Sequence, residues 1–284
     1  MSTVVTAPGG PPLTRPARPG NLPGTLTPVA GIGLGVSLLW FSLLVLIPLC
    51  AVVVTATEGG WANFWSTVTN PQTREAIQLT VGAAAVVTIA NVVTGTAIAW
   101  VLVRDRFVGK RLLELVIDIP FALPTIVAGL VLLSLYGNDS PLGVDVANTS
   151  WSVHLAFLFV TLPFVVRMVQ PVLEELDVEV EEAAAALGAG RVTTFRRIVL
   201  PSLAPAIAAG AALAFARGVG EYGSLVLLSG NLPFESEVAS VRILGAIEND
   251  NPAGAASVAA LLLVISLCVI VVLDVVQRRV AGHG

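Results

Sequence analysis

The chain has 284 residues, of which 55% are hydrophobic and 12% are charged, and its formal net charge at pH 7 is -4. Its mean hydropathy of +0.87 is too high for a soluble domain of this length and predicts an all-α integral membrane protein. The two cysteines, Cys50 and Cys268, are too few for a disulfide framework, and redox chemistry is not expected.

The first 28 residues are rich in proline and glycine and predict a disordered tail. An apolar run from Val29 to Val54 follows this tail. A cleavable signal peptide is an alternative interpretation of the run, but the apolar region of such a peptide is only about 7 to 15 residues long. The greater length favours a first membrane span that is retained.

Six apolar stretches are long enough to cross a bilayer as helices, which takes roughly 20 residues each. They cover residues 29–54, 78–103, 112–136, 152–171, 204–229 and 253–277. An even number of spans places both termini on one side. Arginine and lysine collect in cytoplasmic loops, and the loops opposite the termini contain only Arg74 and Arg242. The sequence therefore predicts cytoplasmic termini, including a short tail at 280–284.

The second and third spans carry small residues and helix breakers. Gly95 and Ala99 have the spacing that lets membrane helices approach closely, and ordinary bundle packing explains them. Pro120 and Pro124 each remove a backbone hydrogen bond from the third span. We therefore expect this span to be a bent helix.

The fifth span contains two ionisable residues, Arg217 and Glu221, within the run FARGVGEYGS. Charges inside a bilayer are costly and usually face a bundle interior or a water-filled cavity, so the two residues are candidates for a translocation pathway. They also lie four positions apart on one helical face and can simply pair with each other. The two interpretations are compatible.

The polar segment 177–201 separates the fourth and fifth spans, on the side of the termini. Asp177 can cap a short helix with an acidic first turn, and Gly188 can help to end it. A second helix can begin near Thr193 or Thr194 and end before Pro201, which gives a helical elbow along the membrane surface. The alternative is a connector that its arginines hold at the lipid headgroups.

The residues of this elbow resemble the EAA loop of the permease subunits of ABC importers, with matching spacing. In that family the loop forms a coupling helix that docks on the ATPase subunit, and the resemblance implies the same coupling role here. The matching residues are Glu182, Ala183, Ala184, Gly188, Ile198, Leu200 and Pro201.

A longer resemblance, from about Gly31 to Arg279, is to the T-type permease of bacterial sulfate/thiosulfate ABC transporters. It is carried by the elbow, by IPFALPTIVAGLVLLSLYG and by FARGVGEYGSLVLLSGNLPFESEVASVRI. It implies a six-span type I ABC importer permease domain over 29–279 and a bacterial inner-membrane location. A permease for molybdate, tungstate or another oxyanion is the nearer alternative. The residues expected to line the pathway are Arg217, Glu221, Tyr222, Pro124 and Thr125.

The resemblance also implies partners, namely two ABC ATPase subunits, a second permease of the W type and a periplasmic or lipid-anchored sulfate-binding protein. The chain lacks the G-x-x-x-x-G-K-[ST] phosphate loop, since Lys110 is followed by Arg111 and the upstream glycine spacing is missing. We therefore expect ATP and Mg²⁺ to bind the partner ATPase, and no catalytic residue, cofactor, metal site or nucleic-acid partner for this chain. A secondary transporter or channel is a remote alternative, because no inverted repeat is evident.

Overall fold

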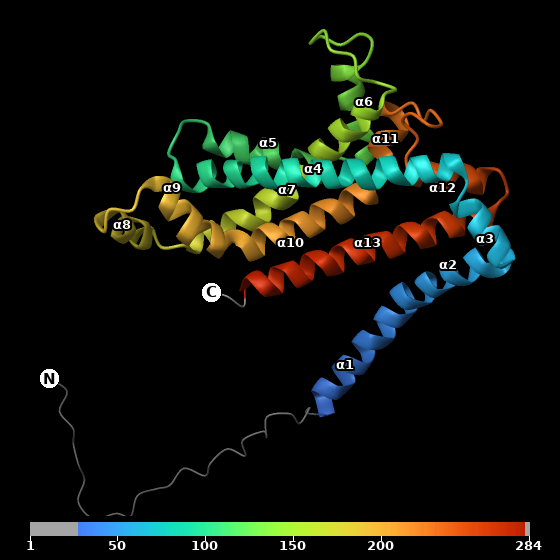
Figure 1. Ribbon diagram of the computed structural model, residues 1–284, viewed down its shortest axis with the longest axis horizontal. Helices are drawn as coiled ribbons and strands as arrows, with labels where there is room; N and C mark the ends of the chain where they lie inside the picture. The colour runs from blue at the N-terminus through green and yellow to red at the C-terminus, as the bar shows by residue number, and fades with distance from the viewer. Residues whose placement is uncertain (1–27, 282–284) are drawn as a thin grey trace, which may run out of the picture. The chain divides into compact units, whose positions relative to one another are not determined.

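The computed structural model describes residues 28–281, and the regular secondary structure in this range is helical (Figure 1). The chain divides into two compact units, Met1–Cys50 and Ala51–Gly284. The described part of the first unit contains α1 (Pro28–Phe41), the π-helical turn η1 (Ser42–Leu46) and the beginning of α2 (Ile47–Glu58). The predicted tail over 1–28 lies outside the described residues except for Pro28, and the short tail at 280–284 begins inside the last helix, which continues to Ala281.

The second unit is built on four long helices. Figure 1 shows α4, α7, α10 and α13 running side by side. Their bounds are α4 (Pro71–Arg104), α7 (Ser150–Glu175), α10 (Leu200–Val219) and α13 (Pro252–Ala281). The shorter helical elements of this unit are α3 (Gly60–Val68), α5 (Lys110–Ala122), α6 (Thr125–Tyr136), α8 (Val178–Ala186), α9 (Arg191–Thr194), the π-helical turn η2 (Phe195–Val199), α11 (Gly223–Leu228) and α12 (Ala239–Glu248).

The centre of this bundle is packed around Val165 of α7, which is fully buried. A Cβ added to Gly95 of α4 would lie 3.0 Å from the Val165 Cβ, and one added to Gly210 of α10 would lie 3.1 Å from the Val165 Cα. Both helices thus approach α7 closely where a side chain is missing. Ala99, one turn after Gly95, is also fully buried. The small residues of the second span therefore serve packing, as their spacing predicted.

Within the described residues, five helices are long and apolar enough to cross a membrane, and α5 with α6 forms a sixth candidate that is bent by 118°. The third span is thus two helices, a much sharper change of direction than the bent helix we expected. Pro124 is the cause, because the residue before a proline is driven out of the helical region. Leu123 accordingly has extended backbone angles, φ -86° and ψ 135°. Pro120, in contrast, lies inside α5.

The fifth span differs from its prediction at both ends. It does not run to residue 229, because α10 ends at Val219 and α11 begins at Gly223. Nor does the second elbow helix end before Pro201: one apolar helix extends from Arg191 to Val219. The π-helical turn η2 comes just before the proline, and there the Leu200 N–H bonds to the carbonyl five residues earlier. This wider turn allows the helix to continue through a residue without an N–H.

Candidate functional site

The elbow begins with a capped helix and ends with a glycine turn. The Asp177 carboxylate accepts a hydrogen bond from the Glu179 N–H at 3.1 Å, which confirms the predicted cap of α8. At the other end, the Gly188 N–H bonds to the Ala185 carbonyl at 2.9 Å and the next N–H, of residue 189, bonds to the carbonyl of residue 184 at 3.0 Å. These two bonds form a Schellman motif. Gly188 has φ +86° and open space around its missing Cβ, so its backbone conformation is what requires glycine.

The outer surface of the elbow combines charged side chains with small and apolar ones, and much of it is exposed. No residue of α8 is buried, and Leu187 and Val192 are 89% and 71% exposed. Glu182 and Ala183 also lie on the exposed side, and among the described residues the Glu182 carboxylate has no hydrogen bond or ion pair. A surface of this kind is typical of a docking site for another protein.

The last three residues that match the EAA loop, Ile198, Leu200 and Pro201, lie in a different environment from the exposed α8. Ile198 is half-buried, whereas Leu200 and Pro201 are exposed. The side chains that fix this stretch in the bundle are instead Val199 and Leu203, which are fully buried and pack with residues of α4 and α7. Val199 and Leu203 are ordinary apolar residues in an apolar stretch, so only the structure identifies them as the side chains that hold this stretch in the bundle.

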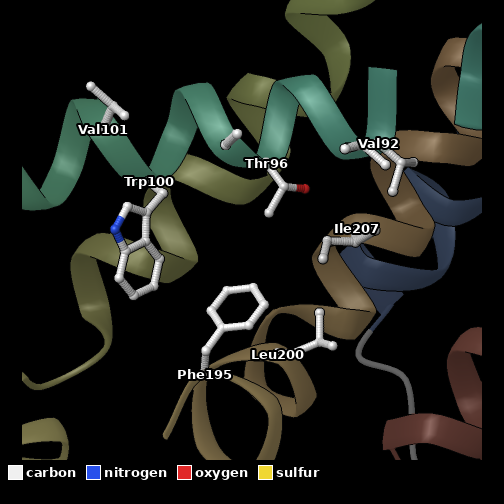
Figure 2. A pocket seen from close by; sticks show the side chains of 9 residues that line it. Val92, Thr96, Trp100, Val101, Phe195, Leu200 and Ile207 are labelled. Carbon is white, nitrogen blue, oxygen red and sulfur yellow. The ribbon is translucent and has the colours of Figure 1, made fainter. Parts of the chain in front are cut away.

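An apolar cavity of about 570 Å³ lies beside this stretch, between α4 and the start of α10 (Figure 2). Trp100 of α4 and Phe195 of η2 face each other at one end of the cavity, with ring centroids 5.7 Å apart in an edge-to-face arrangement. Thr96 contributes a buried hydroxyl without a partner to the lining. The aromatic pair is therefore one of the contacts between the elbow and α4.

The breaks in the third and fifth spans meet. A Cβ added to Gly223, the first residue of α11, would collide with the Thr125 Oγ1 and would lie 3.0 Å from the Ile126 backbone nitrogen. A Cβ added to Gly129 would lie 2.6 Å from the Ser224 carbonyl oxygen. Helices α6 and α11 therefore touch backbone to backbone, and their first residues follow the two breaks. Discontinuous spans with helix ends in the membrane are typical of transporter substrate sites.

Glu221 organises the break after α10. Its Oε2 lies 2.6 Å from an Arg217 Nη1, and its Oε1 accepts hydrogen bonds from the Ser224 N–H at 2.9 Å and from the Ser224 hydroxyl at 2.8 Å. The Glu221 side chain is 1% exposed, whereas the Arg217 side chain is 30% exposed. The Glu221 carbonyl also accepts a hydrogen bond from the Ser240 hydroxyl of α12 at 2.7 Å. Glu221 thus links three helices, α10 and α11 through its carboxylate and α12 through its backbone carbonyl, while its arginine partner stays partly exposed.

The five residues expected to line the pathway thus gather where the two breaks meet. Pro124 and Thr125 lie at the start of α6, and Tyr222, which is 36% exposed, immediately precedes α11. Arg217 and Glu221 do pair with each other, as the simpler interpretation stated. Whether they also line a pathway stays a prediction.

Sequence reasoning missed a second charged pair, which joins the third and fourth predicted spans. Arg167 of α7 grips Asp118 of α5 through two bonds, Nε to Oδ1 at 2.8 Å and Nη2 to Oδ2 at 2.5 Å, and Nη1 donates to the Gln170 side chain at 3.0 Å. Asp118 and Arg167 lie in consecutive predicted spans, and the packing of α5 against α7 brings the two side chains together.

A bundle of apolar helices, with two broken spans around a charged pair and an exposed polar elbow before the fifth span, defines a membrane transport subunit. Residues 91–282 match the family of binding-protein-dependent transport system inner membrane components, and the chain belongs to this family. It is therefore a multi-pass inner membrane protein. The chain is 43% identical over 263 residues to the "Sulfate transport system permease protein CysT" of Salmonella typhimurium, with 89% of this chain and 95% of the relative covered. The protein of the same name from Escherichia coli is 41% identical with the same coverage.

Solved structures confirm the fold. The chain aligns with a TM-score of 0.72 and 14% identity to a bacterial ABC transporter involved in the import of the acidic polysaccharide alginate, covering 88% of this chain and 95% of that chain. For the methionine ABC transporter MetNI the TM-score is 0.56 at 19% identity, with 72% and 94% covered. The expected all-helical fold of the type I ABC importer permeases is therefore confirmed.

Proposed function

We propose that this chain is the T-type permease subunit of an ATP-driven importer of sulfate and thiosulfate. The observation that carries the proposal is the 43% identity to a sulfate transport system permease over 89% of the chain. The junction of the two broken spans adds a physical reason, because it offers a half-exposed arginine to an oxyanion.

Coupling to ATP would run through the elbow. Two ABC ATPase subunits bind ATP and Mg²⁺, and α8 of this chain docks on one of them with its exposed residues, including Glu182, Ala183, Ala184 and Gly188. A W-type permease completes the membrane part, and a periplasmic or lipid-anchored sulfate-binding protein delivers the anion. Both termini lie in the cytoplasm, which the arginine distribution supports.

Passage of the anion would use the junction of the breaks. Glu221 neutralises Arg217 when no anion is present, which lowers the cost of holding a charge inside the bilayer. An arriving dianion competes for the exposed part of Arg217, and Thr125 and Tyr222, at the starts of α6 and α11, carry hydroxyls that can donate to it. Affinity need only differ between the inward-open and outward-open states for the anion to shift their populations.

Transport measurements on the reconstituted complex test the substrate. We expect saturable, ATP-dependent uptake of labelled sulfate and thiosulfate into proteoliposomes, and little uptake of molybdate. An uptake rate for molybdate equal to that for sulfate, at the same anion concentration, would favour the alternative of a permease for another oxyanion. Sulfate uptake without ATP would instead favour a secondary transporter or channel.

The glycine turn provides a matched pair of variants for the coupling role. Gly188 has φ +86°, whereas Gly190 has φ -72°, and neither has an atom within 4 Å of an added Cβ. Gly188→Ala costs about 1–2 kcal/mol in the left-handed conformation, so the end of α8 is displaced and uptake falls several-fold. Gly190→Ala changes neither ATPase binding nor uptake. Equal uptake by both variants would contradict docking through this turn.

A further inference from the structure

Arg104, the last residue of α4, contacts two other elements through one nitrogen. Its Nη2 lies 2.6 Å from the Glu181 Oε1 of α8 and donates to the Leu176 carbonyl, at the C-terminal cap of α7, at 3.1 Å. Both charged side chains are largely shielded, since the arginine is 15% exposed and the glutamate 21%. Partial burial strengthens a charge pair relative to one in open solvent. A single guanidinium therefore ties the elbow to the ends of two membrane helices.

The remaining attachment of the elbow to α4 is sparse. Trp100, one turn before Arg104, stacks near the guanidinium, with the Arg104 Cζ 6.0 Å from the ring centroid, and it meets Phe195 edge to face. The cavity of about 570 Å³ shown in Figure 2 reaches this aromatic pair. A second cavity of about 550 Å³ reaches it too, and Glu181 also lines that one. No residue of α8 is buried, and among residues 28–281 the pair with Arg104 is the polar contact that joins an α8 side chain to the bundle.

We infer that Arg104 is the positioning residue that transmits movement of the docked elbow to α4. The far side of α4 is firmly held, because Ala99 and Leu102 are fully buried in the core shared with α7 and α10. A displacement of α8 by the ATPase pulls on Glu181, and the ion pair passes the displacement to the end of a 34-residue helix. The second cavity, which is lined by residues of both α4 and the elbow, leaves room for the elbow to tilt while Arg104 stays attached. This inference rests on the proposed function, because it requires an ATPase docked on α8.

The experiment measures two properties of the assembled transporter separately, the coupling of anion uptake to ATP hydrolysis and the stability of the α8 helix. Arg104→Gln removes the charge, and Arg104→Lys keeps it and can keep both contacts, since one nitrogen makes them. Arg106→Gln is the matched control, because Arg106 lies two positions away, is exposed, and has no ion pair among residues 28–281. The two readouts are anion uptake per ATP hydrolysed and hydrogen–deuterium exchange of the backbone amides of α8.

For Arg104→Gln we expect normal assembly with the ATPase, at least a tenfold fall in uptake per ATP, and at least a fivefold faster exchange in α8. Arg104→Lys should restore most of both readouts, and Arg106→Gln should match the wild type. The reversed pair Arg104→Glu with Glu181→Arg should recover coupling relative to either single change.

An Arg104→Gln transporter with wild-type uptake per ATP would overturn the inference. So would a reversed pair that restores slow exchange in α8 but leaves coupling low, because the ion pair would then order the elbow without transmitting its movement.

The proposed substrate and the proposed role of Arg104 fail in different ways. If the wild-type complex transports no sulfate, the substrate assignment fails, while the ratio of another transported anion to ATP still tests Arg104.

Discussion

The contact between α6 and α11 leaves no room for a methyl group at Gly129. An added Cβ would lie 2.6 Å from the Ser224 carbonyl oxygen and 2.8 Å from the Ser224 Cα, whereas ordinary contacts begin near 3.4 Å. The clash is with backbone, so no side chain can rotate away and the two helices must separate by roughly the 0.8 Å difference. Overpacking of this kind costs about 1–3 kcal/mol. We therefore predict that Gly129→Ala lowers the stability of the permease.

Thermal unfolding, followed by intrinsic tryptophan fluorescence of the purified complex, measures this effect. For a chain of this size each kcal/mol shifts the midpoint by about 2–4 °C, so a cost of about 1–3 kcal/mol predicts a fall of roughly 2–12 °C. Gly82→Ala is the control, because Gly82 lies on the exposed face of α4 with no atom within 4 Å of an added Cβ. Helix propensity predicts no loss there. Equal midpoints for Gly129→Ala and the wild type would refute the close approach of the two helices.

Two further predictions concern charged and capping side chains. Glu221→Gln leaves Arg217 without its counter-charge, and we expect a loss of about 2–3 kcal/mol, reduced from the fully buried case because the arginine is 30% exposed; thermal unfolding checks it. The double change with Arg217→Gln should recover stability but not anion uptake, and recovery of both would show that the pair is purely structural. Asp177→Ala removes the cap of α8 and should cost about 1 kcal/mol. Hydrogen exchange should then show a roughly fivefold faster exchange rate for the backbone amides in the first turn of α8. An unchanged rate would mean that the bond from the Glu179 N–H contributes nothing to the stability of α8.

Features that depend on neighbouring residues were predictable. The cap at Asp177 and the glycine turn at Gly188 follow from the requirements of helix ends. Each of them involves residues that are only a few positions apart in the sequence. The break at Pro124 was also predictable in position, because a proline restricts the residue before it. Its angle of 118° was not, since a proline restricts the residue before it without fixing where the following helix packs.

The sequence by itself determined that this is a helical membrane protein with an ordered polar elbow, because apolar length and local capping are properties of consecutive residues. Only the tertiary structure decided which charges meet. Arg104 finds Glu181 across 77 positions and Arg167 finds Asp118 across 49, and no short-range pattern predicts such pairs. It also decided that α10 stops at Val219 and that the Gly223 backbone of α11 packs directly against Thr125 of α6. The elbow was visible in the sequence, whereas its attachment to the bundle depends on how separate helices pack.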